Sequence, residues 1–309
     1  VYGTLDLNGH NLTINGLSGN PGTGIVTSSV AGAVTLTVGA AGTSSTFYGT
    51  IQDGAGSVAL EKIGTGTQTL SGANTYSGTT TISNGTLEVG SYGISGTLGS
   101  GAVVNNAALE FRRWDSVTVA NANSGSGTLT QNGYDQYNPY DPNRIGTLIL
   151  TGNNTYTGTT IINRGNLQVG AGGTTGTLGT GAVTSGSEGG DLVFNRSDTM
   201  TVANAISGNI CLVQGPGTSV LTGMNTYSGT TEVNTSSNIR FNGVAGFSST
   251  NIFLNGGLLD LGGPVSENNE IVLGTAPGQV RFKDNGTTDT TSAHGGLAYE
   301  TALCPQRHG

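Results

Sequence analysis

The chain repeats itself on a large scale, and this repetition limits its possible folds more than any other feature. One segment occurs three times, as LSGANTYSGTT at 70–80, LTGNNTYTGTT at 150–160 and LTGMNTYSGTT at 221–231. Its tyrosines, Tyr76, Tyr156 and Tyr227, therefore recur at similar intervals along the chain. Self-similarity of this kind is typical of repeat architectures, in which each unit packs only against its neighbours.

The similarity extends beyond this segment. GTLGSGAV at 96–103 recurs as GTLGTGAV at 176–183, and FRRWDSVTVAN at 111–121 recurs as FNRSDTMTVAN at 194–204. We therefore expect about three copies of one large unit within a single domain at 1–283, with cores near 62–90, 146–170 and 212–243. We expect the remainder, 284–309, to be an irregular C-terminal cap or tail.

Within each copy the pattern predicts short strands. Apolar and polar residues alternate, as in Thr86-Leu-Glu-Val89, and Gly or Asn-Gly bounds each run. The Asn84-Gly85 pair also suits a hairpin in an antiparallel sandwich. The recurrence of strand groups roughly every 20 to 25 residues and the small residues at the corners favour a parallel β-solenoid. We predict an all-β fold of that kind, in which the repeated tyrosines lie several coils apart and form no continuous ladder.

Composition excludes several classes of protein. Glycine supplies 55 of 309 residues without a G-X-Y period, so the chain is not collagen, and its β-branched content does not suit disorder. The net charge is −8 with two lysines, so no basic stripe exists for nucleic acid. No run of 18 apolar residues occurs, and we expect no membrane span in this chain.

A family resemblance follows from the first copy. The run from Lys62 to Val89, with its KIGTG start, NTYSG centre and GTLEV end, closely resembles the autotransporter-associated β-strand repeat, also called the passenger-associated transport repeat. The second copy is interrupted upstream, and the third has Val213 at the ungapped place of the lysine. The resemblance implies a right-handed parallel β-helix at a bacterial surface.

Catalytic patterns are hard to find. The 18 acidic residues are scattered, and Asp260, between leucines, suits the outer face of a strand. The three histidines lack metal-ligand spacing, and no G-x-S-x-G elbow occurs. We expect no enzymatic activity, no metal and no cofactor.

The preferred interpretation is an extracellular structural or adhesive rod that presents loops to surface glycans or proteins. One alternative is a filament subunit that stacks head to tail on itself through open β-edges. A second alternative is a carbohydrate-active enzyme built on a β-helix.

One segment departs from the repeat. Residues 134–144 interrupt the second copy and hold Tyr134, Tyr137, Tyr140 and Arg144. Insertions in solenoids map to loops that often form the binding face, and Tyr and Arg are enriched in interfaces. We predict a contact loop for binding or assembly; the alternative is a tolerated insertion whose tyrosines cover the side of the rod.

Two further features stay open at this level. Cys211 and Cys304 are either unrelated thiols or a disulfide, within the chain or between subunits. The Arg112-Arg113-Trp114 run shares one arginine with the next copy, where Arg196 matches Arg113, and we expect a turn at a corner of the coil.

Overall fold

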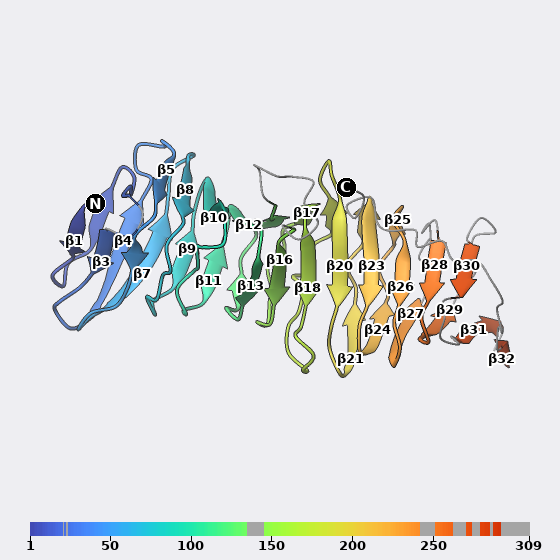
Figure 1. The fold of residues 1–309 in the computed structure, drawn as a ribbon. Coiled ribbons are helices and arrows are strands. Elements are labelled where there is room, and N and C mark those ends of the chain that lie inside the picture. The colour runs from blue at the N-terminus through green and yellow to red at the C-terminus, as the bar shows by residue number, and fades with distance from the viewer. Residues whose placement is uncertain are drawn as a thin grey trace.

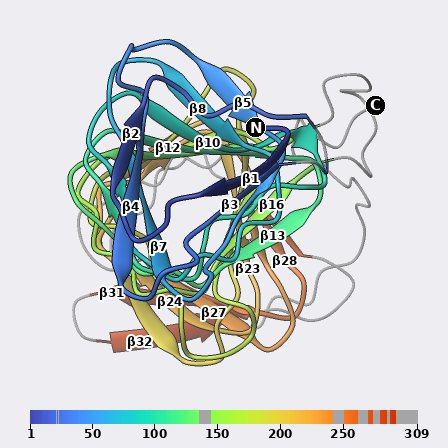
Figure 2. The same ribbon diagram turned by 90° about the vertical axis from the view of Figure 1, so that its left-hand side faces the viewer.

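The computed structural model of the chain is a rod of β-strands, coloured in sequence order from end to end in Figure 1. It describes residues 1–20, 22, 24–134, 145–241, 251–261, 270–273, 279–284 and 287–291. The strands wind around one axis in about 11 turns, which Figure 2 shows in end view. The predicted parallel β-solenoid is therefore confirmed. In the described part of the chain, no helix is long and apolar enough to cross a membrane.

The strands form five sheets, each named here by its first strand. The β1 sheet contains β1 (Gly3–Asp6), β3 (Gly24–Thr27) and β6 (Thr50–Ile51). The β2 sheet contains β2 (Leu12–Ile14), β4 (Ala33–Val38), β7 (Ser57–Lys62), β9 (Thr80–Ile82), β11 (Val103–Asn105) and β14 (Asn123–Ser124). The β5 sheet contains β5 (Ser45–Phe47), β8 (Thr67–Leu70), β10 (Thr86–Gly93), β12 (Ala108–Arg113), β15 (Thr128–Asn132), β17 (Thr160–Arg164), β19 (Val183–Ser185), β22 (Ile206–Gly208) and β25 (Thr226–Tyr227).

The remaining two sheets lie further along the rod. The β13 sheet contains β13 (Ser116–Val119), β16 (Thr147–Leu150), β18 (Asn166–Val169), β20 (Gly190–Phe194), β23 (Ile210–Gln214), β26 (Thr231–Val233), β28 (Asn251–Leu254) and β30 (Glu270–Leu273). The β21 sheet contains β21 (Thr199–Val202), β24 (Gly217–Leu221), β27 (Ser237–Phe241), β29 (Leu258–Leu261), β31 (Gln279–Asp284) and β32 (Thr287–Thr291). Strand β32 pairs antiparallel with β31. Together with Asp284, it is the described part of the predicted C-terminal cap or tail at 284–309.

Neighbouring strands within a sheet are one coil apart in sequence. Leu36 pairs with Leu60, Leu60 with Thr80 and Thr80 with Val103. Each of these intervals agrees with the strand spacing of roughly 20 to 25 residues expected from the sequence. The interval from Leu129 to its partner Thr160 is longer, because this coil holds the insertion.

The core is built by stacking inward residues of successive coils. In β7 the burial alternates strictly, so Val58, Leu60 and Lys62 all face inward. Val58 and Leu60 lie in register on Val34 and Leu36 of β4. Each coil thereby removes a layer of aliphatic side chains from water, which is the main favourable term in folding.

Lys62 is fully buried at the end of this layer. Its ammonium group donates hydrogen bonds to the carbonyls of Ile63 (2.7 Å), Gly64 (2.8 Å) and Asn84 (3.1 Å). The lysine therefore closes a corner of the coil, where carbonyl groups would otherwise lack partners. Gln131 and Gln214 are buried at the ends of β15 and β23 and donate in a similar way to Gly146 and Gly215.

The copies of the repeat do not stack in register. The rod has three faces: the β1 and then the β13 sheet form the first, the β2 and then the β21 sheet the second, and the β5 sheet the third. The equivalent strands β9, β17 and β26 lie on the second, third and first face. Likewise β10, β18 and β27 lie on the third, first and second face. One repeat therefore covers three complete coils and one further face of the rod. Each copy begins one face later than the copy before it, and we call this shift the one-face advance.

Each of the first two copies interrupts one face of the rod, whereas Tyr227 of the third copy lies in β25 and its strand pairs with β22. After β6 the first face continues through the segments around Tyr76 and 96–101, which form no strands, and a new sheet begins at β13. After β14 the second face continues through the segments around Tyr156 and 176–181 before β21 begins. Because of the one-face advance, the two interruptions fall on different faces.

Candidate contact site

The tyrosines shared by the copies are structural. Tyr76, Tyr156 and Tyr227 are fully buried, and their hydroxyl groups lie 2.7 Å from the hydroxyl groups of Thr80, Thr160 and Thr231. Burial raises the pKa of all three phenols. A Cβ added at Gly99 or Gly179 would collide with the ring and carbonyl of Tyr76 or Tyr156. These positions therefore fill and close the core, and they offer no contact surface.

A buried asparagine replaces the missing strand pairing beside each of the first two tyrosines. The Asn74 carbonyl oxygen accepts from the backbone N–H of Ile51 (2.8 Å), and its amide donates to the carbonyl of Thr97 (2.7 Å). Asn154 joins Asn123 (3.1 Å) and Thr177 (2.7 Å) in the same way. The asparagine thus links three successive coils where the sheet is interrupted.

The shared arginine holds a corner, as expected for the Arg112-Arg113-Trp114 run. Arg113 makes two hydrogen bonds to the Asp115 carboxylate (2.8 and 2.7 Å) and one to the carbonyl of Gly96 (2.6 Å). Arg196 makes the equivalent bonds to Asp198 and Gly176. Asp260 of β29 lies on an outer face in register with Arg240, whose guanidinium covers it at 2.8 Å.

Residues that differ between copies meet on the third face. The strands β10, β12, β15 and β17 are consecutive neighbours in the β5 sheet. Near or at their ends they carry Tyr92 in β10, Arg112 in β12, Tyr134 just after β15 and Arg164 in β17. The other copy has Gly172 for Tyr92, Asn195 for Arg112 and Asn84 for Arg164. We call these four residues the Tyr-Arg cluster; all are half-buried.

The cluster is a continuous stack of rings and guanidinium groups. The Arg112 guanidinium lies 4.6 Å from the centre of the Tyr92 ring. The rings of Tyr92 and Tyr134 meet edge to face with centroids 5.4 Å apart, and the Arg164 guanidinium lies 4.3 Å from the Tyr134 ring centre. Such cation–π and edge-to-face contacts fix the side chains in place, which lowers the entropic cost of binding a partner.

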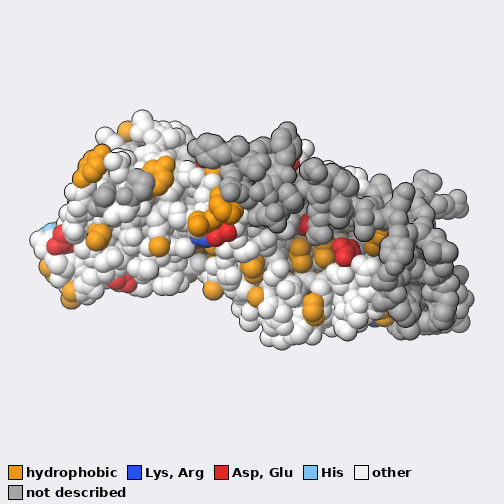
Figure 3. All heavy atoms as spheres, viewed as in Figure 1, with side chains coloured by type: hydrophobic (Ala, Val, Ile, Leu, Met, Phe, Trp, Pro, Cys, Tyr) orange, Lys and Arg blue, Asp and Glu red, His pale blue; other side chains and the backbone are white. Residues whose placement is uncertain are grey.

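Two carboxylates anchor the stack. Arg112 forms ion pairs with Glu88 (2.9 Å) and Glu110 (3.0 Å). Burial raises the pKa of the Glu88 carboxyl above its ordinary value, although Arg112 opposes the shift. Burial also raises the pKa of the Tyr92 phenol to about 12, so this hydroxyl keeps its proton at neutral pH and can donate a hydrogen bond. Charged side chains are few on the face drawn in Figure 3, where most of the described surface is white.

Replacing Glu88 by glutamine should change the pH dependence of stability. A carboxyl whose pKa is raised on folding contributes stability that is present below its unfolded pKa and is lost as pH rises through the folded pKa. The unfolding free energy of the wild type relative to Glu88→Gln should therefore fall as pH rises from about 4 to 7. Urea titrations across this pH range measure the unfolding free energy, with Glu188→Gln at an exposed position as the control. If the unfolding free energies of the wild type and Glu88→Gln change with pH in parallel, the raised pKa of Glu88 is contradicted.

The structure describes the predicted contact loop only at its start, and the loop's role in contacts stays a prediction. Tyr134 belongs to the cluster, whereas Tyr137, Tyr140 and Arg144 lie outside the described residues. The sequence reasoning missed Tyr92 and Arg164 as members of a site, and it favoured a corner turn over a sugar or carboxylate site for the run that holds Arg112. A comparison of the copies could have found them, because these positions carry different residues in the other copy. The expected coil length would then have placed them on neighbouring strands.

The structure describes one of the two cysteines. Cys211 is buried in β23 and is disulfide-bonded. Cys304, the other cysteine of the chain, lies outside the described residues. Within the described part of the chain, no group of three or more His, Cys, Asp or Glu side chains is placed to hold a metal ion.

The fold and its repeats define the class of protein as a repeat-built β-solenoid. The model of the passenger-associated transport repeat matches residues 60–89, 145–169 and 213–235, so the chain carries three such repeats and the predicted resemblance is confirmed. Over 91 residues, 29% of this chain, it is 43% identical to the adhesin BmaC autotransporter of Brucella suis biovar 1 (strain 1330). That match covers 2% of the adhesin. No solved structure matches the chain.

Proposed function

We propose that this chain is an extracellular adhesive segment of a bacterial surface protein, a rod without enzymatic activity that presents the Tyr-Arg cluster to a partner. Support comes from the three passenger-type repeats and from the adhesin that shares 43% identity over 91 residues. The observation that carries the proposal is the convergence of the unrepeated residues Tyr92, Arg112, Tyr134 and Arg164 on one face, while the shared residues stay inside.

The chemistry of the cluster suits a glycan or protein surface. Aromatic rings offer a flat apolar face, the guanidinium groups offer donors and the carboxylates of Glu88 and Glu110 offer acceptors. Tyr and Arg are also the residue types that dominate binding hot spots. Tyr134 of the cluster is the first residue of the insertion at 134–144, and solenoid insertions often belong to the binding face.

The test is adhesion by a Tyr92→Ala/Arg164→Ala variant. Beads that display the chain are applied to arrays of glycans and extracellular-matrix proteins. One hot-spot truncation that removes about 2 kcal/mol of contact energy weakens binding ~30-fold, so the double variant should weaken attachment by at least that factor. Tyr48→Ala, at a half-exposed tyrosine remote from the cluster in sequence, is the matched control and should leave attachment unchanged.

Replacement of residues 134–144 by a Gly-Ser linker extends the same test to the insertion. We expect attachment to fall as well, with an unchanged midpoint of thermal unfolding. No attachment by the wild type, or equal attachment by wild type and the Tyr92→Ala/Arg164→Ala variant, would contradict the proposal.

The filament and enzyme alternatives remain separate predictions. The antiparallel strand β32 occupies the outer edge of β31, so head-to-tail stacking would have to use other strands at that end. Size-exclusion chromatography and negative-stain imaging decide between a single rod and a thread. A carbohydrate-active enzyme would require a cleft with at least two acidic residues on neighbouring coils.

A further inference from the structure

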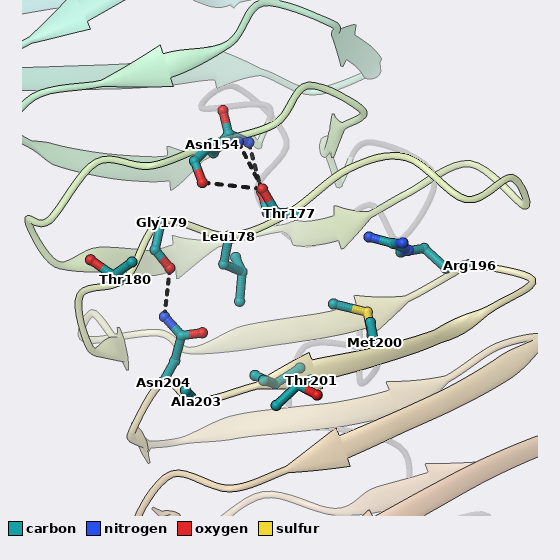
Figure 4. Close-up of a pocket in the computed structure, with 11 residues that line it drawn as sticks. Asn154, Thr177, Leu178, Gly179, Thr180, Arg196, Met200, Thr201, Ala203 and Asn204 are labelled. Carbon is teal, nitrogen blue, oxygen red and sulfur yellow. Dashed lines mark hydrogen bonds between the residues drawn. The ribbon is translucent and has the colours of Figure 1, made fainter.

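A groove runs along the second face where the sheet is interrupted. It lies between the segment 176–181 and strand β21, has a volume of about 430 Å³ and is drawn in Figure 4. Leu178, Met200 and Val202 supply its apolar part, and Arg196 and Asn204 are among its polar lining residues. Its volume lies within the usual range of ligand sites, about 300 to 1,000 Å³.

One wall of the groove is an open strand edge. Strand β21 is the first strand of its sheet, so only its other edge pairs, with β24. Across that paired edge, the carbonyls of Asp198 and Val202 accept from Thr218 (3.0 Å) and Thr222 (2.9 Å). Successive residues of a strand direct their backbone groups to opposite edges. The N–H and C=O groups of Thr199 and Thr201 therefore point to the unpaired edge, where Thr201 lines the groove.

The opposite wall is bonded to the preceding coil. Thr177 and Thr180 donate their backbone N–H groups to Gly152 (3.1 Å) and Tyr156 (2.8 Å). The side-chain amide of Asn204 donates to the carbonyls of Gly179 (2.8 Å) and Gly181 (2.6 Å) and ties the two walls together at one end. The backbone of this segment is thus bonded to the coil before it, and the side chain of Asn204 links it to the end of β21.

The charge of the groove selects an uncharged occupant. The Arg196 guanidinium is paired with the Asp198 carboxylate at 2.8 and 2.6 Å, so the two charges cancel. Among the described residues that line the groove, none is aromatic, so it lacks the flat face on which sugars stack. Unpaired backbone groups beside apolar side chains instead match the requirements of strand addition.

We propose that the groove along β21 binds an extended, uncharged peptide, which adds as a strand to the edge of Thr199 and Thr201. The bound peptide comes from another polypeptide and pairs through main-chain hydrogen bonds, with small apolar side chains against Leu178 and Met200. This site is independent of the Tyr-Arg cluster and does not rest on the adhesive function proposed above.

The repeat provides a second edge with the same construction. Strand β13 is the first strand of its sheet, and the carbonyls of Asp115 and Val119 accept from Thr147 (3.2 Å) and Thr151 (3.0 Å) of the next coil. Thr118 therefore faces the interruption of the first face, as Thr201 faces that of the second.

The decisive variant is Thr201→Pro. Proline removes the N–H group that faces the groove but none of the bonds to β24, and it is tolerated on edge strands for that reason. Thr201→Val, which keeps the N–H group, is the matched control. The probe is the blocked peptide acetyl-TVTVTV-amide, compared with the same peptide N-methylated at alternate residues.

Amide hydrogen exchange and NMR shifts of the whole chain report the outcome. We expect the unmodified peptide to slow amide exchange at positions 199 and 201 at least tenfold in the wild type and in Thr201→Val. Thr201→Pro and the N-methylated peptide should both abolish the effect at this site, while Thr118→Pro should leave it intact. Lack of binding by the wild type, equal binding by Thr201→Pro, or binding of neutral oligosaccharides in place of the peptide would overturn the proposal.

Discussion

Replacing Tyr156 by alanine should destabilise the rod by about 4 kcal/mol, because truncating a fully buried aromatic side chain leaves a cavity that the stacked coils cannot close. Gly179 packs directly on this ring and has no side chain of its own that could fill the space. Tyr156→Phe should cost only about 1 kcal/mol, the value of the hydrogen bond between the tyrosine hydroxyl and Thr160.

Chemical denaturation followed by circular dichroism measures both values. Tyr2→Ala provides a control of the same residue type, since 81% of the Tyr2 side chain is exposed, and should change stability by less than about 0.5 kcal/mol. A loss for Tyr156→Ala no greater than that for Tyr2→Ala would show that the shared tyrosine is not a core residue.

The second large effect is expected for Asn154→Ala, at about 3 kcal/mol. The variant leaves the backbone N–H of Asn123 and the C=O of Thr177 without their side-chain partners in the interrupted face. Each buried, unpaired backbone group costs about 1–3 kcal/mol. The loss should appear as an earlier midpoint of urea unfolding.

The neighbouring residue supplies the control for that variant. Asn153 is exposed, and the first copy has Ala73 at the same place, so Asn153→Ala should be nearly neutral. Equal effects of the two substitutions would contradict the view that the asparagine of the repeat replaces strand pairing between coils.

Much of the fold follows from local sequence. The alternation in 57–62 predicts that Val58 and Leu60 face the core, and the regular recurrence of strand groups along the chain predicts the coil. The same alternation also places Lys62 inside, against the general preference of lysine for water. That position becomes intelligible only when the corner carbonyls are seen, because no local pattern marks them as acceptors.

The one-face advance could not be predicted so directly. The reason is that some segments, such as those around Tyr76 and 96–101, form one face of a coil without forming a strand. A count of strand patterns in the sequence therefore gives the wrong number of faces per coil. The Tyr-Arg cluster was missed for a related reason. Tyr92, Arg112 and Arg164 are far apart in sequence, and only the stacking of coils brings them together.

Disulfide trapping of Ile161→Cys with Thr130→Cys tests the central claim, that the copies form a parallel solenoid and advance one face per repeat. The two residues are in register on neighbouring strands, β15 and β17, and both are half-exposed. Neighbouring strands are about 4.8 Å apart, within the range a disulfide spans. Mass spectrometry of the mildly oxidised chain should find the 130–161 cross-link in high yield. A cross-link of Ile161→Cys with Ser124→Cys instead, as stacking without the one-face advance would give, would contradict the account.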